Sequence, residues 1–265
     1  AELSFARALN SLDIRLKHNN VAGDPSKKIN QKEGILSFKA YTLALIGGSL
    51  NSQKKLVEAE YYYRESLKIY LGLGGKNSIR VARALARLSN CLNEQSRFEE
   101  AHILAQYSLK TYLDAGLSDT AANVIQSKKA VASSLVNIEK YSEALSYFSS
   151  IQTAIDSDEF LKKSLGKLGD LDEVIALIFT KNTSKAEIIA KSIFEDQKNK
   201  VGTNHPRTIL AQAFYAVTLN EQKKTEEAKN NFKAVIPILI EQVRNDSETS
   251  NINHKAQRRF SMIAE

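Results

Sequence analysis

The sequence predicts an all-α protein built from stacked helix pairs, and three observations support this fold class. A short pattern returns every 42 or 43 residues, apolar residues recur at three- and four-residue spacing, and helix breakers are rare, with only 3 prolines among 265 residues. We therefore expect a right-handed α-α superhelix of about five helix pairs, with partial repeats at both ends.

One alanine marks each predicted unit, and we call these five residues the packing alanines. They are Ala59, Ala101, Ala144, Ala186 and Ala228, so that successive spacings are 42, 43, 42 and 42. Four of the five follow a glutamate, which favours a helix N-terminus. A single methyl group lets two helix backbones approach closely, so we expect these residues to serve packing rather than chemistry.

Each unit contains two helical patterns separated by a short turn. In the second unit, apolar and small residues recur at helical spacing from Val81 to Leu92, and again from Ala101 to Tyr112. The sequence Ser66–Leu71 (SLKIYL) also returns 42 residues later as Ser108–Leu113 (SLKTYL). The unit is therefore predicted to be a helix, a tight turn near Arg97, and a second helix.

The N-terminal part departs from this regular period. Residues 1–18 align with the second helix of a repeat, and the polar stretch 19–33, which contains Gly23, Asp24 and Pro25, is predicted to be a long loop. The chain starts at Ala1 without an initiator methionine, so we expect it to be a fragment of a longer protein.

The remaining residues are assigned in order along one solenoid domain that spans 1–265. The predicted segments are repeat 1 (34–76), repeat 2 (77–118), repeat 3 (119–157), repeat 4 (158–204), repeat 5 (205–245) and a capping or next-repeat helix (253–265). Repeat 4 departs most from the pattern, because Gly166 and Gly169 interrupt its first helix and Glu173 stands where leucine is expected. We expect its helix boundaries to differ from those of the other repeats.

The pattern of Leu88, the aromatic Phe98 and the small Ala101 resembles the tetratricopeptide repeat (TPR). The 42-residue period, longer than the usual 34, is similar to the variant in kinesin light chains and many bacterial multidomain proteins. The sequence Val201–Thr208 (VGTNHPRT) resembles the Gly-Asn-His-Pro connection of that variant, and Gly47 occupies a position where the family often has glycine. The resemblance covers about residues 34–243, while HEAT and armadillo repeats remain a structural alternative.

The resemblance implies a non-catalytic scaffold that binds a peptide or a partner segment in a concave groove. Arginines in such a groove can bind carboxylates, and asparagine amides can hold an extended backbone. We therefore expect an acidic protein segment, or another domain of the same chain, to bind there. The predicted partner-binding residues are Arg80, Arg83, Arg87, Asn90, Asn93, Gln126, Lys129, Ser133, Asn51 and Asn220.

A second function stays open at this point. Bacterial proteins with this repeat type are often fused to a caspase-like CHAT peptidase or a signalling ATPase. The chain could thus be a regulatory or substrate-docking arm of a larger bacterial enzyme. A reading frame that continues beyond Glu265 into a domain with catalytic His and Cys residues would support this alternative.

Two motifs suggest chemistry but have simpler explanations. Cys91 and His102 resemble a thiol-hydrolase pair, yet Cys91 lies at an inward helical position and is expected to pack as a small apolar residue. Gly72–Gly75 followed by Lys76 resembles a phosphate loop, but its spacing is wrong and it lies where a helix should end. No two histidines have metal-ligand spacing. We therefore expect no enzymatic activity, cofactor or metal.

Charge and hydropathy limit the remaining function classes. The net charge of +7 permits weak attraction to nucleic acid, but 30 acidic residues dilute the 37 basic ones and no basic tail is present, so we do not expect a nucleic-acid partner. No apolar run reaches the roughly 20 residues of a membrane-spanning helix. The single cysteine cannot form an intrachain disulfide, and a cytoplasmic location is favoured.

Overall fold

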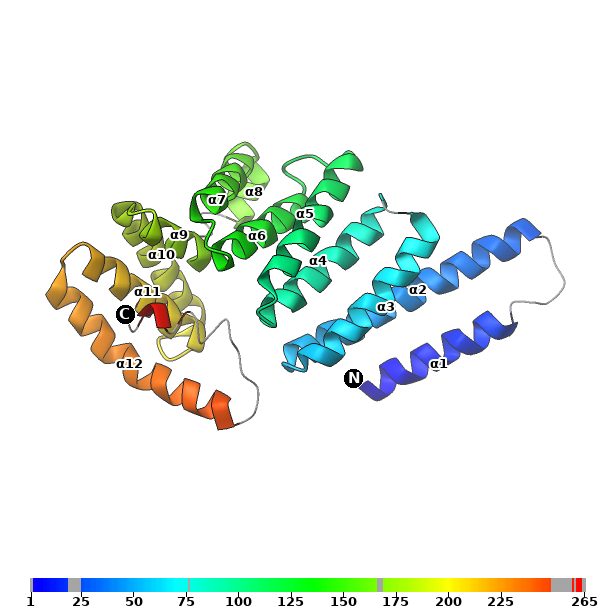
Figure 1. Ribbon diagram of the computed structural model, residues 1–265, viewed down its shortest axis with the longest axis horizontal. Coiled ribbons are helices and arrows are strands. Elements are labelled where there is room, and N and C mark those ends of the chain that lie inside the picture. Colours follow the sequence, from blue (N-terminus) through cyan, green and yellow to red (C-terminus); the bar gives the residue numbers. More distant parts are fainter. Residues whose placement is uncertain are drawn as a thin grey trace. The chain divides into compact units, whose positions relative to one another are not determined.

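The computed structural model describes residues 2–18, 25–75, 77–165, 169–248, 259 and 261–263. The regular structure within these ranges is helical and includes no strand, as predicted. The chain divides into two compact units, Ala1–Ser127 (unit 1) and Lys128–Glu265 (unit 2). Each unit consists of antiparallel helix pairs (Figure 1).

Unit 1 contains the partial N-terminal repeat and repeats 1 and 2. Repeat 1 is the pair α2 and α3, and repeat 2 is the pair α4 and α5, each joined by a short turn. The helices of this unit are α1 (Glu2–His18), α2 (Pro25–Ser52), α3 (Leu56–Gly74), α4 (Ile79–Glu94), α5 (Phe98–Asp114) and the first part of α6 (Ala122–Asn137).

The long loop predicted at residues 19–33 is wrong over most of its length, because α2 already begins at Pro25. Proline is favoured in the first turn of a helix, where its missing N–H would have no intrahelical partner. Residues 29–34 are exposed, so their polarity reflects a solvent-facing helix rather than irregular backbone. The predicted residues 19–24 lie outside the described ranges.

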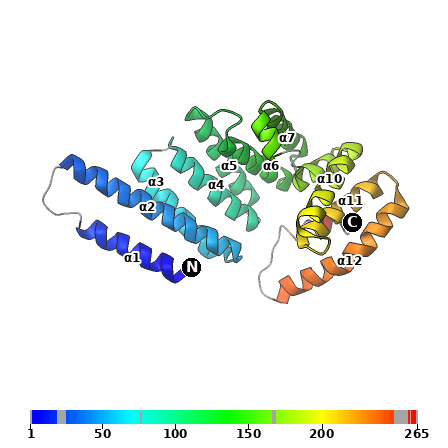
Figure 2. The same ribbon diagram turned by 180° about the vertical axis from the view of Figure 1, so that it is seen from behind.

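Unit 2 contains repeats 4 and 5 and the larger part of repeat 3, whose first helix α6 begins in unit 1. Repeat 3 consists of α6 and α7 and repeat 5 of α11 and α12 (Figure 2). Repeat 4 consists of α9 and α10 (Figure 1). The helices that follow α6 are α7 (Tyr141–Asp156), α8 (Glu159–Leu165), α9 (Leu171–Phe179), α10 (Thr183–Val201), α11 (Pro206–Glu221) and α12 (Thr225–Glu248). Residues 259 and 261–263 are also helical.

Repeat 4 has the shortest first helix of the described repeats, as the sequence suggested. Its helix α9 has 9 residues, whereas α4 and α11 have 16 each. A Cβ atom at Gly169 would meet the side chains of Ile189 and Ile193 at 2.7 and 2.8 Å. Gly169 is therefore required for the close approach of the chain to α10 just before α9 begins.

The packing alanines behave as the sequence predicts. Ala59, Ala101, Ala144 and Ala186 are 0% exposed and Ala228 is 2% exposed. A Cβ atom at Gly47 would lie 2.9 Å from the Tyr63 ring and 3.2 Å from the Ala59 carbonyl oxygen. Helices α2 and α3 thus touch almost backbone to backbone, which only small residues permit.

The five turns inside the repeats share one backbone conformation. A residue other than glycine adopts a left-handed conformation in each turn, five positions before the packing alanine. These residues, with φ between 60° and 64°, are Lys54, Ser96, Glu139, Lys181 and Lys223. The next N–H donates to a carbonyl in the first helix, as in Lys55 N to Leu50 O (3.0 Å) and Lys224 N to Leu219 O (3.0 Å). This bond satisfies a carbonyl at the end of the first helix.

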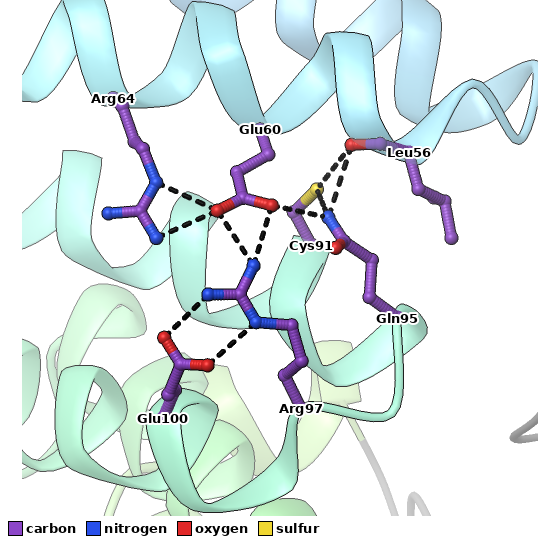
Figure 3. A network of polar contacts seen from close by, with 7 residues as sticks. All are labelled: Leu56, Glu60, Arg64, Cys91, Gln95, Arg97 and Glu100. Carbon is purple, nitrogen blue, oxygen red and sulfur yellow. Dashed lines mark hydrogen bonds and ion pairs between the residues drawn. The ribbon is translucent and has the colours of Figure 1, made fainter.

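A polar cluster joins repeat 1 to repeat 2, and we call it the junction cluster (Figure 3). Glu60 accepts hydrogen bonds from Gln95 Nε2 (2.9 Å) and from Arg97 Nη1 (2.8 and 2.9 Å). Gln95 Nε2 also donates to the Leu56 carbonyl at 3.2 Å. The cluster ties the second helix of one repeat to the turn of the next.

The same cluster recurs between repeats 4 and 5 at equivalent positions. Glu187 accepts from Gln222 Nε2 (2.6 Å) and Lys224 Nζ (2.7 Å), and Gln222 Nε2 donates to the Thr183 carbonyl (3.2 Å). Each glutamate directly follows a packing alanine, and each glutamine lies six residues before the next one. The repeat therefore fixes its polar junction as well as its apolar contacts.

Candidate partner-binding surfaces

Unit 1 has a pocket of about 520 Å³ at the start of its two complete repeats. Helices α2, α3 and α4 all contribute to it. Its lining residues are Asn30, Glu33, Gly34, Ser37, Phe38, Tyr41, Tyr70, Leu73, Arg80 and Arg83. Two of the predicted partner-binding arginines are thus brought together with two exposed aromatic side chains, Phe38 (55% exposed) and Tyr41 (43%).

The N-terminus of α4 is held in place by a helix cap. Ser78 is the N-cap residue, and its side chain accepts hydrogen bonds from the N–H groups of Arg80 (3.2 Å) and Val81 (3.5 Å). Gly75, with φ of 68°, ends α3 immediately before it. The glycines that resembled a phosphate loop therefore end one helix, and this turn places Arg80 and Arg83 at the pocket.

The arginines in and beside this pocket lie near tyrosines. In the part of the chain that the structure describes, no ion pair engages Arg80, Arg83 or Arg87. Burial raises the pKa of Tyr70, and the positive charges of Arg87, Arg80 and Arg83 oppose that rise. Burial likewise raises the pKa of Tyr112, with Arg83 opposing it. The pocket therefore has positive charge available to a ligand, with Glu33 as the acidic residue in its lining.

The predicted asparagines have three different environments. Asn93 is buried, Asn51 is half-buried and Asn220 is exposed, although all three lie eight residues before a packing alanine. The side-chain oxygen of Asn51 is buried without a hydrogen-bond partner in the described structure. A uniform ladder of asparagine amides is therefore not present, whereas Asn90 in unit 1 is exposed as expected.

The predicted residues of repeat 3 are divided between the two units. Gln126 is exposed and belongs to unit 1, while Lys129 and Ser133 belong to unit 2. There Lys129 Nζ lies 3.6 Å from Asp170, and Ser133 Oγ donates to Asp172 Oδ2 at 2.5 Å. Their polar groups already have acidic partners within unit 2, so they do not extend the cationic surface of unit 1.

A second pocket, of about 230 Å³, lies in unit 2. Among its lining residues, only Asn220 is a predicted partner-binding residue. It is lined by α9, α11 and α12 together with residues near the C-terminus. The lining residues are Ile175, Ile178, Phe179, Lys181, Phe214, Val217, Asn220, Glu221, Phe232, Met262 and Ile263. The repeat register could have indicated the first part of this lining, because Ile175 and Val217 each lie 11 residues before a packing alanine.

Cys91 is a structural residue of the junction cluster. Its side chain is 0% exposed, and Sγ donates to the Leu56 carbonyl at 3.4 Å (Figure 3). Burial raises the pKa of this thiol, which opposes formation of the nucleophilic thiolate. The arrangement supports the packing interpretation of Cys91 rather than a thiol-hydrolase pair with His102.

The described ranges contain no group of three or more His, Cys, Asp or Glu side chains that could hold a metal ion. None of the helices in those ranges combines the length and apolarity that a membrane crossing needs.

Comparisons with known proteins agree with this architecture. Residues 38–114 match the family model described as tetratricopeptide repeat. Among solved structures, BtubC (BKLC) from P. vanneervenii has a TM-score of 0.61 at 12% identity, covering 90% of this chain and 92% of that chain. The comparison with curated protein sequences finds no match.

Two further solved structures have the same fold. TPR-like repeats of a candidate kinesin light chain from Podosopora anserina have a TM-score of 0.58 at 12% identity, covering 79% of this chain and 98% of that chain. Aspartyl phosphate phosphatase F from Bacillus subtilis has a TM-score of 0.56 at 15% identity, covering 98% of this chain and 68% of that chain. Identities this low establish a common fold and nothing finer.

Proposed function

We propose that the chain is a non-catalytic protein-interaction scaffold that binds an acidic peptide segment in unit 1. The match of residues 38–114 to the tetratricopeptide repeat model and the fold shared with kinesin light chain-like repeat arrays support this proposal. Stacked helix pairs create extended surfaces without a catalytic centre, and partner recognition is the common use of such surfaces. The pocket between α2, α3 and α4 is the proposed contact point.

The observation that carries this proposal is the pairing of exposed aromatic surface with positive charge that no ion pair engages in the described structure, although Arg83 forms a hydrogen bond to Tyr112. Arg80 and Arg83 line the pocket without an ion pair in the described structure, and Phe38 and Tyr41 expose their rings beside them. Guanidinium groups form strong, often bidentate hydrogen bonds to carboxylates. Exposed aromatic rings supply apolar contact area at small entropic cost. A segment with Asp or Glu next to an apolar side chain fits both features.

Arg87 and Asn90 extend the same surface along α4. Arg87 lies close enough to Tyr63 and Tyr70 for its charge to lower the pKa of both hydroxyls against the larger effect of burial. Asn90 is exposed one turn further on and offers an amide that can pair with a peptide backbone. An extended peptide would thus run along α4 from Arg80 toward Asn90.

Peptide binding to charge-reversed variants tests the proposal. The probe is a fluorescein-labelled pool of nine-residue peptides, each with three Asp or Glu and one Phe or Leu, measured by fluorescence anisotropy at 50 and 200 mM salt. The unmodified chain should bind this pool and should bind a pool with Lys in place of the acidic residues at least tenfold more weakly. The double variant Arg83→Glu/Arg87→Glu should lose at least tenfold in affinity and most of the salt dependence.

A matched control distinguishes the pocket from the net charge. Lys68 and Lys110 are exposed at equivalent positions of α3 and α5, so Lys68→Glu/Lys110→Glu makes the same change in net charge away from the pocket. This variant should retain binding within about twofold. Equal losses in the two double variants, or equal binding of acidic and basic pools, would contradict the proposed site.

The alternative function, a docking arm of a larger enzyme, stays a prediction. Both functions require the same surface, and they differ in what is attached to the chain. The full reading frame distinguishes them.

A further inference from the structure

One face of repeats 4 and 5, which is lined by α9, α11 and α12 and which we call the inner face, contacts described residues near the C-terminus. Met262 and Ile263 line one pocket together with α9, α11 and α12, and Ile263 is only 6% exposed. Arg259 Nη2 lies 2.5 Å from Asp172 Oδ1, although 87 residues separate them in the sequence. Figure 1 shows the short red segment that contains residues 261–263 beside α11.

Asp172 makes this contact selective for a positive charge. The residue is 4% exposed, and its other carboxylate oxygen, Oδ2, accepts a hydrogen bond from Ser133 Oγ. Removing the charged partner of a buried carboxylate is destabilising, because the carboxylate loses a favourable charge interaction in a poorly solvated place. A segment on this face therefore binds best when it places a guanidinium or ammonium group at Asp172.

The rest of the lining is mostly apolar, with Lys181, Asn220 and Glu221 as its polar members, and it follows the repeat register. Ile175 and Val217 lie 11 residues before their packing alanines, and Phe179 and Glu221 lie 7 before them. Adjacent repeats thus contribute side chains from equivalent positions of their first helices. Met262 and Ile263 meet these side chains three and four residues after Arg259, a spacing that places all three on one face of a helix.

The prediction that residues 253–265 form a capping helix or the first helix of another repeat stays a prediction, because the structure describes only 259 and 261–263 of them. A cap would pack against repeat 5, and Met262 and Ile263 do line a pocket with residues of α11 and α12. Arg259 also reaches Asp172 on α9, one repeat earlier. The other residues of the predicted segment are outside the described ranges.

We propose that the face formed by α9, α11 and α12 is a second docking groove, whose partner is a basic amphipathic helical segment with Arg or Lys at one position and apolar side chains three and four residues later. Arg259, Met262 and Ile263 occupy the groove in cis by presenting this same pattern. A tethered segment acts at an effective concentration of about millimolar, so it holds the groove closed against weak partners. The groove is formed by other helices than the unit 1 pocket and selects the opposite charge. An experiment can therefore disprove one of the two proposed sites without disproving the other.

The test opens the groove in the full chain. Arg259→Gln/Ile263→Ser removes the two anchoring side chains from the internal competitor without touching the groove. The probe is a fluorescein-labelled synthetic peptide of residues 255–265 with the native sequence, measured by fluorescence anisotropy. The opened variant should bind it at least tenfold more tightly than the unmodified chain, because the peptide no longer competes with a tethered copy. Equal affinities for the two chains would overturn the proposal.

The charge requirement is tested in the opened variant. Adding Asp172→Asn should weaken peptide binding at least tenfold, while Glu195→Gln, at an exposed position of α10, should leave it within twofold. A peptide with Arg259→Gln should lose as much affinity on the opened variant, which tests the same contact without changing the fold of the protein. Unchanged affinity in this peptide experiment would overturn the assigned contact.

Sedimentation of the unmodified chain tests whether occupation is intramolecular. A monomer mass across a hundredfold range of concentration supports binding in cis. A dimer that dissociates in the Arg259→Gln/Ile263→Ser variant would overturn it, because the segment would then dock on a second copy.

Discussion

Units 1 and 2 share the positions that hold repeats together and differ in the residues of their inner faces. The packing alanines are fully or almost fully buried in both units, and the Glu60–Gln95–Arg97 junction of unit 1 recurs as Glu187–Gln222–Lys224 in unit 2. The position 11 residues before the packing alanine is instead exposed Asn90 in unit 1 and buried Ile175 in unit 2.

This difference shows that one repeat framework can carry two unlike surfaces. The junction positions are restricted because a larger or uncompensated side chain there would clash or leave a buried charge unpaired. The positions that line the two pockets are not part of these junctions, so their chemistry can vary from repeat to repeat. Unit 1 offers arginines and aromatic rings, whereas unit 2 offers a buried carboxylate and apolar side chains.

The largest effect should come from enlarging a packing alanine, and the comparison requires it to be similar in both units. Ala101→Leu and Ala186→Leu should each lower the free energy of unfolding by about 3 kcal/mol, because neither buried site has room for three more carbon atoms. Urea unfolding followed by circular dichroism measures this. Ala234→Leu, at an exposed position of α12, should change stability by less than about 0.5 kcal/mol. A large loss of unfolding free energy in only one of the two variants would show that the packing alanines of the two units are not equivalent.

A smaller effect should follow from neutralising the junction glutamates. Burial raises the pKa of Glu60, but hydrogen bonds from Gln95, Arg64 and Arg97 outweigh this and leave it below the ordinary value of 4.5. The hydrogen bond from Lys224 lowers the pKa of Glu187. Glu60→Gln and Glu187→Gln should each cost about 1–2 kcal/mol of unfolding free energy at pH 7, since each removes charge-assisted hydrogen bonds at a partly buried site.

The pH dependence of these two variants sharpens the comparison. A carboxylate whose pKa is lowered by folding contributes stability that is present above its unfolded pKa and is lost as pH falls through its folded pKa. The difference between each variant and the unmodified chain should therefore shrink as pH falls below 4.5. Glu143→Gln is the control, because Glu143 and its partner Lys140 are both well exposed and should show little effect. If the difference in unfolding free energy instead grew as pH fell, the pKa values of Glu60 and Glu187 would not be lowered by folding.

The smallest effect should be a gain in stability at the turns. Ser96 has a φ of 61°, and its buried Oγ has no hydrogen-bond partner in the described structure, so Ser96→Gly should raise the unfolding free energy by about 1 kcal/mol. Lys223→Gly, at the equivalent exposed turn of unit 2, relieves only the strain of the left-handed backbone conformation. It should therefore raise the unfolding free energy by less than Ser96→Gly does. Thermal and urea unfolding measure both, and a loss in Ser96→Gly would show that its hydroxyl is satisfied in solution.

Particular residues show how much of the structure can be predicted from the sequence. Val201–Thr208 was assigned to a connection, and the structure has His205 as the N-cap of α11, accepting from Arg207 N at 3.2 Å, with Pro206 in the first turn. Arg80 and Arg83 do meet in one pocket, because they lie one turn apart on a single helix. The loop at residues 19–33 was misassigned because exposed polar helices and polar loops have similar composition.

The sequence by itself determined the period, the helix pairs and the packing alanines, because each of these follows from local spacing or from size at one repeated position. Only the tertiary structure decided that Lys129 and Ser133 are engaged by acids of repeat 4, and that Arg259 binds Asp172. Such contacts join residues 39 to 87 positions apart through the fold of several helices, and no local pattern encodes them.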